Sequence, residues 1–360
     1  MVNTSDLDQV RSKIDALDRQ LLDLISERAR LAREIGRIKQ NSGEGVNYYR
    51  PEREAAILRR VVSANPGPLS GDSIRFLFRE IMSACLALEQ PLQIAYLGPE
   101  GTFTQLASYK HFGHAAKTVP SASIADIFRA VAAAEVDYGV VPVENSIEGV
   151  VNQTLDMFVT SALTICGEIE LSIRHHLLSK TADIDALEVV YAHQQAFAQC
   201  RQWLDSHLAG IRQVSVSSNA EAARLAAETE HAAAIAAESA AEIYGLGVLA
   251  SKIEDSPDNT TRFLVLGRHP AGASGKDKTS LLLSTANRPG SLFELLEPFA
   301  RHKVSLTRIE SRPSRQANWN YLFFVDIEGH IDDDKVARAV AEVRARAATA
   351  KVLGSYPVAV

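Results

Sequence analysis

Aliphatic residues recur with heptad spacing along the first forty residues of the chain. Nine of the ten heptad positions are aliphatic, namely Leu7, Val10, Ile14, Leu17, Leu21, Leu24, Leu31, Ile35 and Ile38, and the tenth is Arg28. This pattern predicts a long amphipathic helix over 6–40. Two further helices are predicted over 51–64 and 72–89, on either side of a Pro-Gly-Pro break. Three helices of such unequal length make a poor core for a monomer, so we expect this segment to pair with a second copy.

The sequence pattern changes at Pro91, after which short β-rich runs alternate with alanine-rich helical runs. Strands are predicted over 93–98, 138–143, 188–191, 213–217, 233–236 and 263–267. Helices are predicted over 103–111, 124–134, 195–207, 220–229 and 239–244. The alternation indicates an α/β domain, and its length favours two small lobes that face a cleft.

The last part of the chain follows a linker, 269–278, that is rich in glycine, lysine and proline. Strands are predicted over 280–285, 304–310, 321–328 and near Val352, with helices over 292–302 and 333–347. The resulting order βαββαβ is typical of the ferredoxin-like fold.

Composition narrows the classes of partner. The chain has 360 residues and a net charge of −6, without a long basic run, which argues against nucleic acid. No apolar stretch approaches the ~20 residues of a membrane span, so we expect a soluble cytoplasmic protein with no membrane partner and no targeting signal. Cys85, Cys166 and Cys200 are predicted to be buried free thiols. No metal-ligand spacing is present, so neither a metal nor another cofactor is expected.

Arg28 is the one charge in the aliphatic seam. A guanidinium there stays charged and is costly to desolvate, so it needs an anion. That anion is either a bound ligand or a protein carboxylate that fixes helix register, and the seam alone does not decide between them. Lys39 lies three turns further along nearly the same face, so the two side chains could straddle a small dianion. Arg11 lies about 25 Å away on the straight helix, so it could serve that ligand only from an antiparallel second copy.

Three strand junctions of the α/β segment carry polar residues. Residues 96–104 place glycines and Thr102 between a strand and a helix, where backbone N–H groups can face an anion, although an ordinary turn with a helix N-cap explains them equally well. The other two junctions present Glu144, Asn145 and Ser146 after one strand, and Thr260, Thr261 and Arg262 immediately before another. Each could be turn chemistry alone, but three in one domain favour a site for a small anion.

Four stretches in order, 96–104, 141–156, 261–263 and 310–313, resemble one family: the bifunctional chorismate mutase/prephenate dehydratases of phenylalanine biosynthesis. The resemblance spans essentially the whole chain. It implies an all-α, AroQ-type three-helix dimerising mutase domain over 1–90 and a two-lobed, periplasmic-binding-protein-like α/β dehydratase domain over 92–268. A ferredoxin-like ACT regulatory domain would follow over 278–357. Chorismate and prephenate are then the substrates, L-phenylalanine is the effector, and the protein is a homodimer or higher oligomer.

The resemblance also assigns roles in the mutase domain. Arg28, with Arg11 of the partner chain, would clamp the carboxylates of chorismate, and Lys39 would face its ether oxygen. The remaining contacts fall on Arg53, Glu54, Cys85 and Glu89, of which Glu54 would meet the substrate hydroxyl. The family's loop aspartate is missing from 47–51, and Cys85 and Glu89 replace a serine and a glutamine. An ionised glutamate only accepts hydrogen bonds, so Glu89 could assist the ether oxygen only when protonated.

In the dehydratase domain the resemblance gives Thr261 the role of hydrogen-bonding the departing hydroxyl of prephenate. The expected prephenate-binding residues are Thr102, Glu144, Asn145, Ser146, Thr261, Arg262 and Phe263. Arg262 either binds substrate or ties its loop to the fold. The expected effector-binding residues of the ACT domain are Asn287, Pro289, Gly290, Ser291, Leu292, Glu310, Ser311, Arg312 and Pro313. A purely structural dimerisation domain is the alternative for this last part.

Three other functions compete with this interpretation. A ligand-sensing regulator would suit the helical dimer and the cleft, but no basic recognition helix is visible. An arogenate dehydratase would have little use for a fused mutase that makes prephenate. A degenerate mutase domain that only dimerises is disfavoured because Arg11, Arg28, Lys39 and Glu54 are all present.

Overall fold

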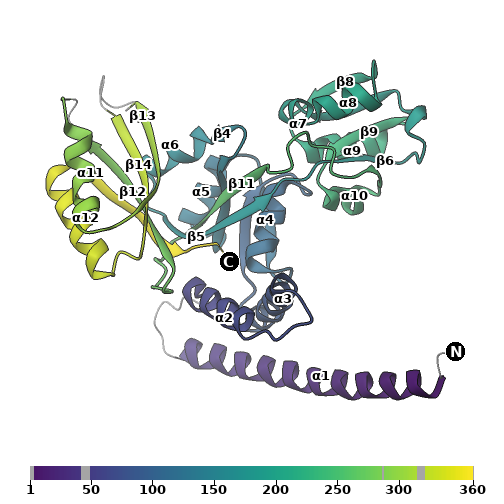
Figure 1. The fold of residues 1–360 in the computed structure, drawn as a ribbon, viewed down its shortest axis with the longest axis horizontal. Helices are drawn as coiled ribbons and strands as arrows, with labels where there is room; N and C mark the ends of the chain where they lie inside the picture. Colours follow the sequence, from purple (N-terminus) through teal and green to yellow (C-terminus); the bar gives the residue numbers. More distant parts are fainter. Residues whose placement is uncertain (1–3, 42–48, 286–287, 314–320, 360) are drawn as a thin grey trace. The chain divides into compact units, whose positions relative to one another are not determined.

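Helices α1 (Thr4–Asn41), α2 (Pro51–Ser63) and α3 (Gly71–Glu89) form the N-terminal part of the computed structural model, which describes residues 4–41, 49–285, 288–313 and 321–359 (Figure 1). The chain divides into two units. The first holds α1, α3 and the end of α2 from Leu58, and the second holds Pro51–Ile57 of α2 and nearly all of the chain after residue 92. All three helices match the predicted ones to within two residues.

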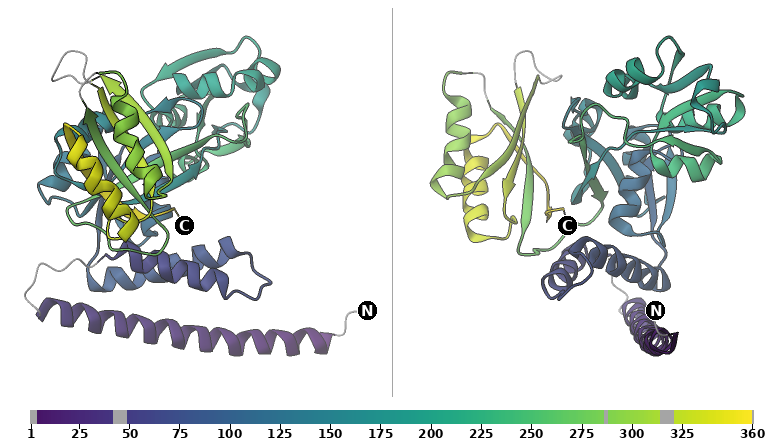
Figure 2. Two further views of the ribbon diagram at one scale, coloured as in Figure 1. Left: turned by 60° about the vertical axis from the view of Figure 1, so that its left-hand side comes forward. Right: turned by 45° about the vertical axis from the view of Figure 1, so that its right-hand side comes forward.

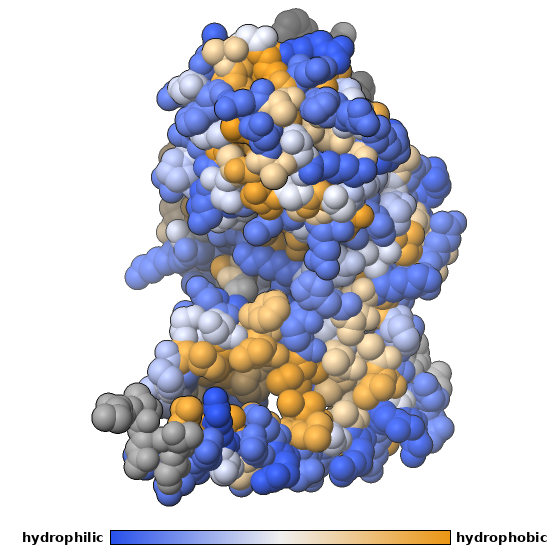
Figure 3. All heavy atoms as spheres, turned by 90° about the vertical axis from the view of Figure 1, so that its right-hand side faces the viewer, coloured by the Kyte–Doolittle hydropathy of each residue, from blue (hydrophilic) through white to orange (hydrophobic). Residues whose placement is uncertain are grey.

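The aliphatic seam of α1 is exposed in the single chain. Its nine aliphatic side chains, from Leu7 to Ile38, are 43–64% exposed, and hydrophobic residues gather over the helical part in Figure 3. Among the described side chains of α1, the buried positions are Ala32 and Gly36. A Cβ at Gly36 would lie 3.3 Å from the backbone of Glu89, so α1 and α3 approach closely there. The predicted burial of the seam is therefore not supplied within one chain.

The first lobe of the α/β domain is a mixed sheet in the order β2-β1-β3-β11-β5, with β4 paired to β3. Its strands are β1 (Gln93–Leu97), β2 (Lys117–Ser121), β3 (Tyr138–Asn145), β4 (Gly149–Val150), β5 (Thr164–Ser172) and β11 (Thr260–Gly267). Its helices are α4 (Phe103–Phe112), α5 (Ile124–Ala132) and α6 (Asn152–Thr160). Strand β11 runs antiparallel to both β3 and β5, so it lies inside the sheet although the chain reaches it last.

The second lobe is a sheet in the order β10-β6-β9-β7-β8. Its strands are β6 (His176–Ser179), β7 (Val189–His193), β8 (Arg212–Val216), β9 (Ala232–Ala236) and β10 (Gly247–Ala250). Its helices are α7 (Gln194–Gln199), α8 (Arg201–His207), α9 (Asn219–Glu228) and α10 (Glu238–Tyr244), with a 3₁₀ turn, η1, at Ile184–Ala186. Small buried residues such as Ala222, Ala226 and Ala234 form the core on the side of α9, because they let this helix pack close to the sheet.

The C-terminal domain has the predicted βαββαβ order: β12 (Asp277–Thr285), α11 (Ser291–Arg301), β13 (Leu306–Pro313), β14 (Tyr321–Glu328), α12 (Asp334–Arg346) and β15 (Thr349–Pro357). The sheet is antiparallel in the order β13-β14-β12-β15. Both helices cover one face (Figure 2). Leu282, Phe324, Leu353 and Tyr356 on the other face join the core of the first lobe. A Cβ at Gly354 would overlap the carbonyl oxygen of Ile165, so the two sheets meet there backbone to backbone.

Three corrections to the predicted elements concern the two lobes of the α/β domain. The predicted helix over 195–207 is two helices, α7 and α8, because the backbone at Cys200 (φ −116°, ψ 17°) departs from helical geometry. Strand β11 begins at Thr260 and not at Phe263. Elements β2, β4, β5, β6, β10 and α6 were not predicted. The second correction matters most, because Thr261 and Arg262 then lie within a strand and not before it.

Candidate active site

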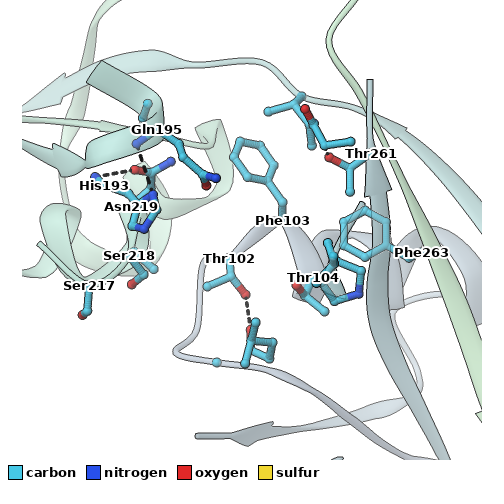
Figure 4. Close-up of a pocket in the computed structure, with 18 of the residues that line it drawn as sticks. Thr102, Phe103, Thr104, His193, Gln195, Ser217, Ser218, Asn219, Thr261 and Phe263 are labelled. Carbon is cyan, nitrogen blue, oxygen red and sulfur yellow. Dashed lines mark hydrogen bonds between the residues drawn. The ribbon is translucent and has the colours of Figure 1, made fainter. Parts of the chain in front are cut away.

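A cavity of about 860 Å³ opens between the two lobes (Figure 4). This volume suits a small-molecule substrate. The first lobe contributes Thr102, Phe103, Thr104, Asn145, Glu148, Thr261 and Phe263 to its lining, and the second contributes His193, Gln195, Gln199, Ser217, Ser218 and Asn219. The polar groups among these are hydroxyls, amides, an imidazole and one carboxylate. The cleft that the sequence predicts is therefore present, and both lobes supply polar groups to it.

Thr261 lies directly opposite Asn145 on the neighbouring strand. The Asn145 side chain amide donates from Nδ2 to Thr261 Oγ1 at 2.8 Å, and its Oδ1 accepts the backbone N–H groups of Ile147 and Glu148 at 3.0 Å each. Because a backbone N–H can only donate, these two bonds fix which end of the amide is oxygen. Thr261 Oγ1 must then accept from Asn145, which leaves the hydroxyl proton of Thr261 free to be donated into the cleft.

Thr102 closes the turn before α4 and also lines the cleft. Its Oγ1 donates to the carbonyl oxygen of Leu97 at 2.9 Å (Figure 4). The same oxygen accepts the N–H of Gln105 at 3.4 Å. The second bond is a helix cap. The turn with a helix N-cap is therefore confirmed for Thr102, which also borders the cleft; an anion held by this turn stays a prediction.

The second lobe supplies residues that the sequence analysis missed. Ser218 caps α9 by accepting the N–H of Glu221 at 3.0 Å, and Asn219 Oδ1 accepts the N–H of His193 at 2.9 Å. His193 Nδ1 in turn accepts the N–H of Gln195 at 3.3 Å, which caps α7. These residues follow strands and begin helices. The same signal, polar residues between a strand and a helix, thus marks these junctions as it marks those of the first lobe.

Three predicted prephenate-binding residues, Glu144, Ser146 and Arg262, do not line the cleft. Successive residues of a strand face opposite sides, so where Asn145 and Thr261 face the cleft, Glu144 and Arg262 face the C-terminal domain. Glu144 forms an ion pair of 2.7 Å with Arg308. Ser146 accepts the N–H of Thr260 at 3.0 Å and donates to the carbonyl oxygen of Asp258 at 3.3 Å, which ties the turn to the strand.

Arg262 is held by a buried polar network. Its Nε donates to Glu168 at 2.9 Å, its Nη1 to Asp326 at 2.6 Å and its Nη2 to the Tyr356 hydroxyl at 3.0 Å. Burial opposes the charge of Arg262, but Tyr356, Asp326 and Glu168 raise its pKa, so the guanidinium stays charged. Of the two predicted roles for Arg262, the structure supports the one that ties the strand to the fold.

His175 borders the cleft without being exposed to it. The side chain is 2% exposed, and its Nε2 lies 2.8 Å from Gln199 Oε1. Burial lowers the pKa of His175 and also that of its neighbour His176. Both imidazoles are therefore neutral at pH 7.

In the helical unit the structure brings together two of the predicted chorismate-binding residues. Lys39 Nζ lies 3.3 Å from Glu89 Oε2, across the contact of α1 with α3. Cys85 is buried on α3, and Arg28 Nη1 lies 3.5 Å from the carbonyl oxygen of Ile81. Arg11 is exposed beside Asp8, and Arg53 and Glu54 lie in the first turn of α2.

The predicted effector residues fall at one end of the C-terminal sheet, where Thr285 at the end of β12 and Pro313 at the end of β13 both pair with Tyr321 of β14. Pro289, Gly290, Ser291 and Leu292 surround the start of α11, and Asn287 lies outside the described residues. Glu310, Ser311, Arg312 and Pro313 end β13. Arg312 donates to the carbonyl oxygen of Asn152 at 2.7 Å and to Asp156 at 2.5 Å, so it connects this run to α6.

The three cysteines are free and buried, as predicted. Burial raises the pKa of the Cys166 thiol to about 12. Within the described ranges, no three histidine, cysteine or acidic side chains are grouped to hold a metal ion. The helices of those same ranges include none whose length and apolar character would let it span a bilayer.

A two-lobed α/β domain with a hydroxyl- and amide-lined cleft, followed by a ferredoxin-like domain, defines a small-molecule enzyme with an attached regulatory module. Three family descriptions match the chain: chorismate mutase type II over residues 10–90, prephenate dehydratase over 94–271 and ACT domain over 279–345. The chain is 51% identical over 364 residues to a bifunctional chorismate mutase/prephenate dehydratase of Pseudomonas aeruginosa, with all of both chains covered. It is 52% identical over 353 residues to the Neisseria gonorrhoeae protein of the same description, covering 97% of this chain and 96% of that one.

Among solved structures, the prephenate dehydratase of Arthrobacter aurescens in complex with L-Phe is similar, with a TM-score of 0.69 and 36% identity, covering 74% of this chain and 90% of that one. The chain belongs to the bifunctional chorismate mutase/prephenate dehydratase family. It therefore has both enzyme activities together with an ACT regulatory domain, which confirms the resemblance drawn from the four sequence stretches.

Proposed function

We propose that Thr261 donates the hydrogen bond that helps the ring hydroxyl leave prephenate. The departing group takes a proton as carbon dioxide is lost and the ring becomes aromatic. A threonine hydroxyl is too weak an acid to remain ionised near neutrality, so it acts as a donor in a relay that ends in solvent. The observation that carries this proposal is the 2.8 Å bond from Asn145 Nδ2, which makes Thr261 Oγ1 an acceptor and leaves its proton free.

The substrate anion would lie between the starts of α4 and α9. Thr102 and Phe103 border the cleft from one lobe, and Ser218 and Asn219 border it from the other. The N–H groups at the start of a helix and the helix dipole favour a carboxylate. Thr102, Asn145, Thr261 and Phe263 remain as prephenate-binding residues, whereas Glu144, Ser146 and Arg262 act by holding the strands.

For the mutase reaction we propose a homodimer in which α1 pairs with its counterpart in an antiparallel sense. The exposure of the whole aliphatic seam supports this, since pairing would cover it. Each site would combine Arg28, Lys39, Cys85 and Glu89 of one chain with Arg11 of the partner chain, and Arg53 and Glu54 would complete the contacts. The rearrangement of chorismate needs no nucleophile, so these residues fold the dianion and stabilise the charge that develops on its ether oxygen.

We also propose that L-phenylalanine binds the ACT domain, which occupies about 278–357 after a mutase domain over 1–90 and a dehydratase domain over 92–268. The residues concerned are those at 287–292 and 310–313. The ion pairs from Arg308 and Arg312 to Glu144 and Asp156 place this domain against the strand and helix next to the cleft. A cytoplasmic location fits an enzyme of amino acid biosynthesis with three free thiols.

The proposed role of Thr261 is tested by supplying chorismate and, separately, prephenate to purified variants while prephenate and phenylpyruvate are followed. We expect Thr261→Ala to lose the dehydratase activity by about 10²–10⁴-fold and to keep the mutase activity. Thr260→Ala on the same strand is the matched control and should keep both activities. A Thr261→Ala protein with normal dehydratase activity would show that the proposed role is wrong, and loss of both activities would indicate misfolding.

A further inference from the structure

Asn145 and three further residues form a closed ring of hydrogen bonds that spans both lobes. Asn145 Nδ2 donates to Asn259 Oδ1 at 2.8 Å, and Asn259 Nδ2 donates to Gln199 Oε1 at 3.0 Å. Gln199 Nε2 donates to Glu148 Oε1 at 3.2 Å, and the backbone N–H of Glu148 returns to Asn145 Oδ1 at 3.0 Å. We name these four residues the amide ring. Gln199 belongs to α7 of the second lobe, whereas the other three lie on or beside the strands of the first.

The direction of every bond in the amide ring is determined. The carboxylate of Glu148 can only accept, so Gln199 must turn its Nε2 toward it and its Oε1 toward Asn259. From the other side, the backbone N–H groups of Ile147 and Glu148 fix Asn145, so its Nδ2 faces Asn259. Asn259 must therefore accept at one end and donate at the other. An asparagine does both, and this one is completely buried.

Asn145 Nδ2 donates its second hydrogen to Thr261 Oγ1, so Thr261 is hydrogen-bonded to the amide ring. The orientation of the catalytic hydroxyl thus depends on a chain of amides that ends in a helix of the opposite lobe. We propose that Asn259 is a positioning residue of the dehydratase reaction, which links Gln199 of the second lobe to Asn145 and so keeps the Thr261 hydroxyl directed into the cleft. This inference rests on the proposed role of Thr261 and assigns to Asn259 no contact with the substrate.

The test uses the full-length protein and two substitutions at one position. Asn259→Ala removes both bonds, and we expect kcat of the dehydratase to fall about 10–100-fold with KM for prephenate little changed. Asn259→Asp keeps the acceptor toward Asn145, but when ionised it sets an oxygen against Gln199 Oε1. A protonated aspartic acid can donate there as asparagine does. We therefore expect the loss in Asn259→Asp to be large at about pH 9 and relieved toward about pH 6.

A second variant tests the ring independently of pH. In Asn259→Asp with Glu148→Gln the carboxylate moves from one side of Gln199 to the other. Gln199 can then reverse its amide, so that its Nε2 donates to the carboxylate introduced at position 259 and its Oε1 accepts from the amide introduced at position 148. We therefore expect kcat at the higher pH to recover at least tenfold. Glu148→Gln alone is measured as the reference: the recovery is the kcat of the double variant relative to Asn259→Asp, divided by the effect of Glu148→Gln in the otherwise unsubstituted protein.

Other titratable groups near Asn259 are Glu148, His175 and the Arg174–Glu254 ion pair of 2.9 Å, so each pH series is divided by that of the unsubstituted protein. Mutase activity and the melting temperature report folding in every variant. Wild-type kcat in Asn259→Ala would overturn the inference. A loss of kcat in Asn259→Asp that is relieved neither by lower pH nor by the added Glu148→Gln substitution would also overturn the inference. If Thr261→Ala, measured in parallel, keeps its dehydratase activity, the proposed role of Thr261 is wrong. The inference about Asn259, which depends on that role, is then wrong as well.

Discussion

Replacing Arg262 by methionine should destabilise the second unit and leave prephenate binding intact. Methionine has nearly the length of the arginine stem but lacks the guanidinium. Glu168 is 0% and Asp326 is 7% exposed, so both carboxylates would remain buried after their partner is removed. Loss of one partner from a buried ion pair costs about 3–5 kcal/mol. We expect the lower end of this range, because Lys278 still reaches Glu168 at 2.9 Å and Ser280 still donates to Asp326 at 2.5 Å.

The assay is thermal unfolding followed by circular dichroism, together with dehydratase kinetics below the transition. A loss of about 3 kcal/mol corresponds to a fall in Tm of about 6–12 °C for a unit of this size. Arg129→Met is the matched control: its ion pair with Asp126 is exposed, with side chains 72% and 30% accessible, and removing it should change the stability by less than about 1 kcal/mol. A tenfold rise in KM for prephenate with an unchanged Tm would refute the reasoning and return Arg262 to the substrate site.

Three further predictions concern the mutase site and the response to acid. Because an ionised Glu89 can only accept hydrogen bonds whereas a glutamine amide can donate to the ether oxygen, Glu89→Gln should at least keep the mutase kcat/KM; a loss of about tenfold or more in the variant would exclude the role. Burial lowers the pKa of His175 and His176, so below the ordinary value near 6.5 the unfolded chain binds protons that the folded chain does not. The free energy of unfolding, measured from denaturant midpoints, should therefore be highest above about pH 7 and decline toward pH 5. The decline should be up to about 1.4 kcal/mol per pH unit for each histidine. It should be smaller in the His175→Gln/His176→Gln protein. Finally, mixing inactive Arg11→Ala and Arg28→Ala proteins under conditions of subunit exchange should restore about a quarter of the wild-type mutase activity, since half of the dimers are mixed and each of these has one intact site. No recovery would mean that the two arginines do not meet across a dimer.

The sequence was most informative where a pattern was local and strong. The heptad period of α1 and the βαββαβ order both hold, because a helix face or a strand face of constant polarity extends over many residues. The start of β11 was misread for the opposite reason. Thr260, Thr261 and Arg262 are polar because one side of the strand borders the cleft and the other meets the buried Glu168 and Asp326, and such a strand resembles a turn in sequence.

The residues that line the cleft show a second limit to what can be predicted from the sequence. Thr102, Asn145 and Thr261 were found because each stands at a strand junction of recognisable type. Gln199 and Asn219 were missed, although they belong to the same cavity. Their proximity to Thr261 depends on how two separate sheets face each other, and no local pattern encodes that.

Strand β11 has one further consequence, which concerns what evolution can change. Side chains alternate along it, so Thr261 faces the cleft while Arg262 faces the ACT sheet. A single inserted or deleted residue would exchange the two faces, directing an arginine into the cleft and a hydroxyl at two buried carboxylates. Strand β11 therefore cannot change its register, and a descendant without the ACT domain would leave Arg262 without Asp326 and the Tyr356 hydroxyl, with Glu168 still its partner.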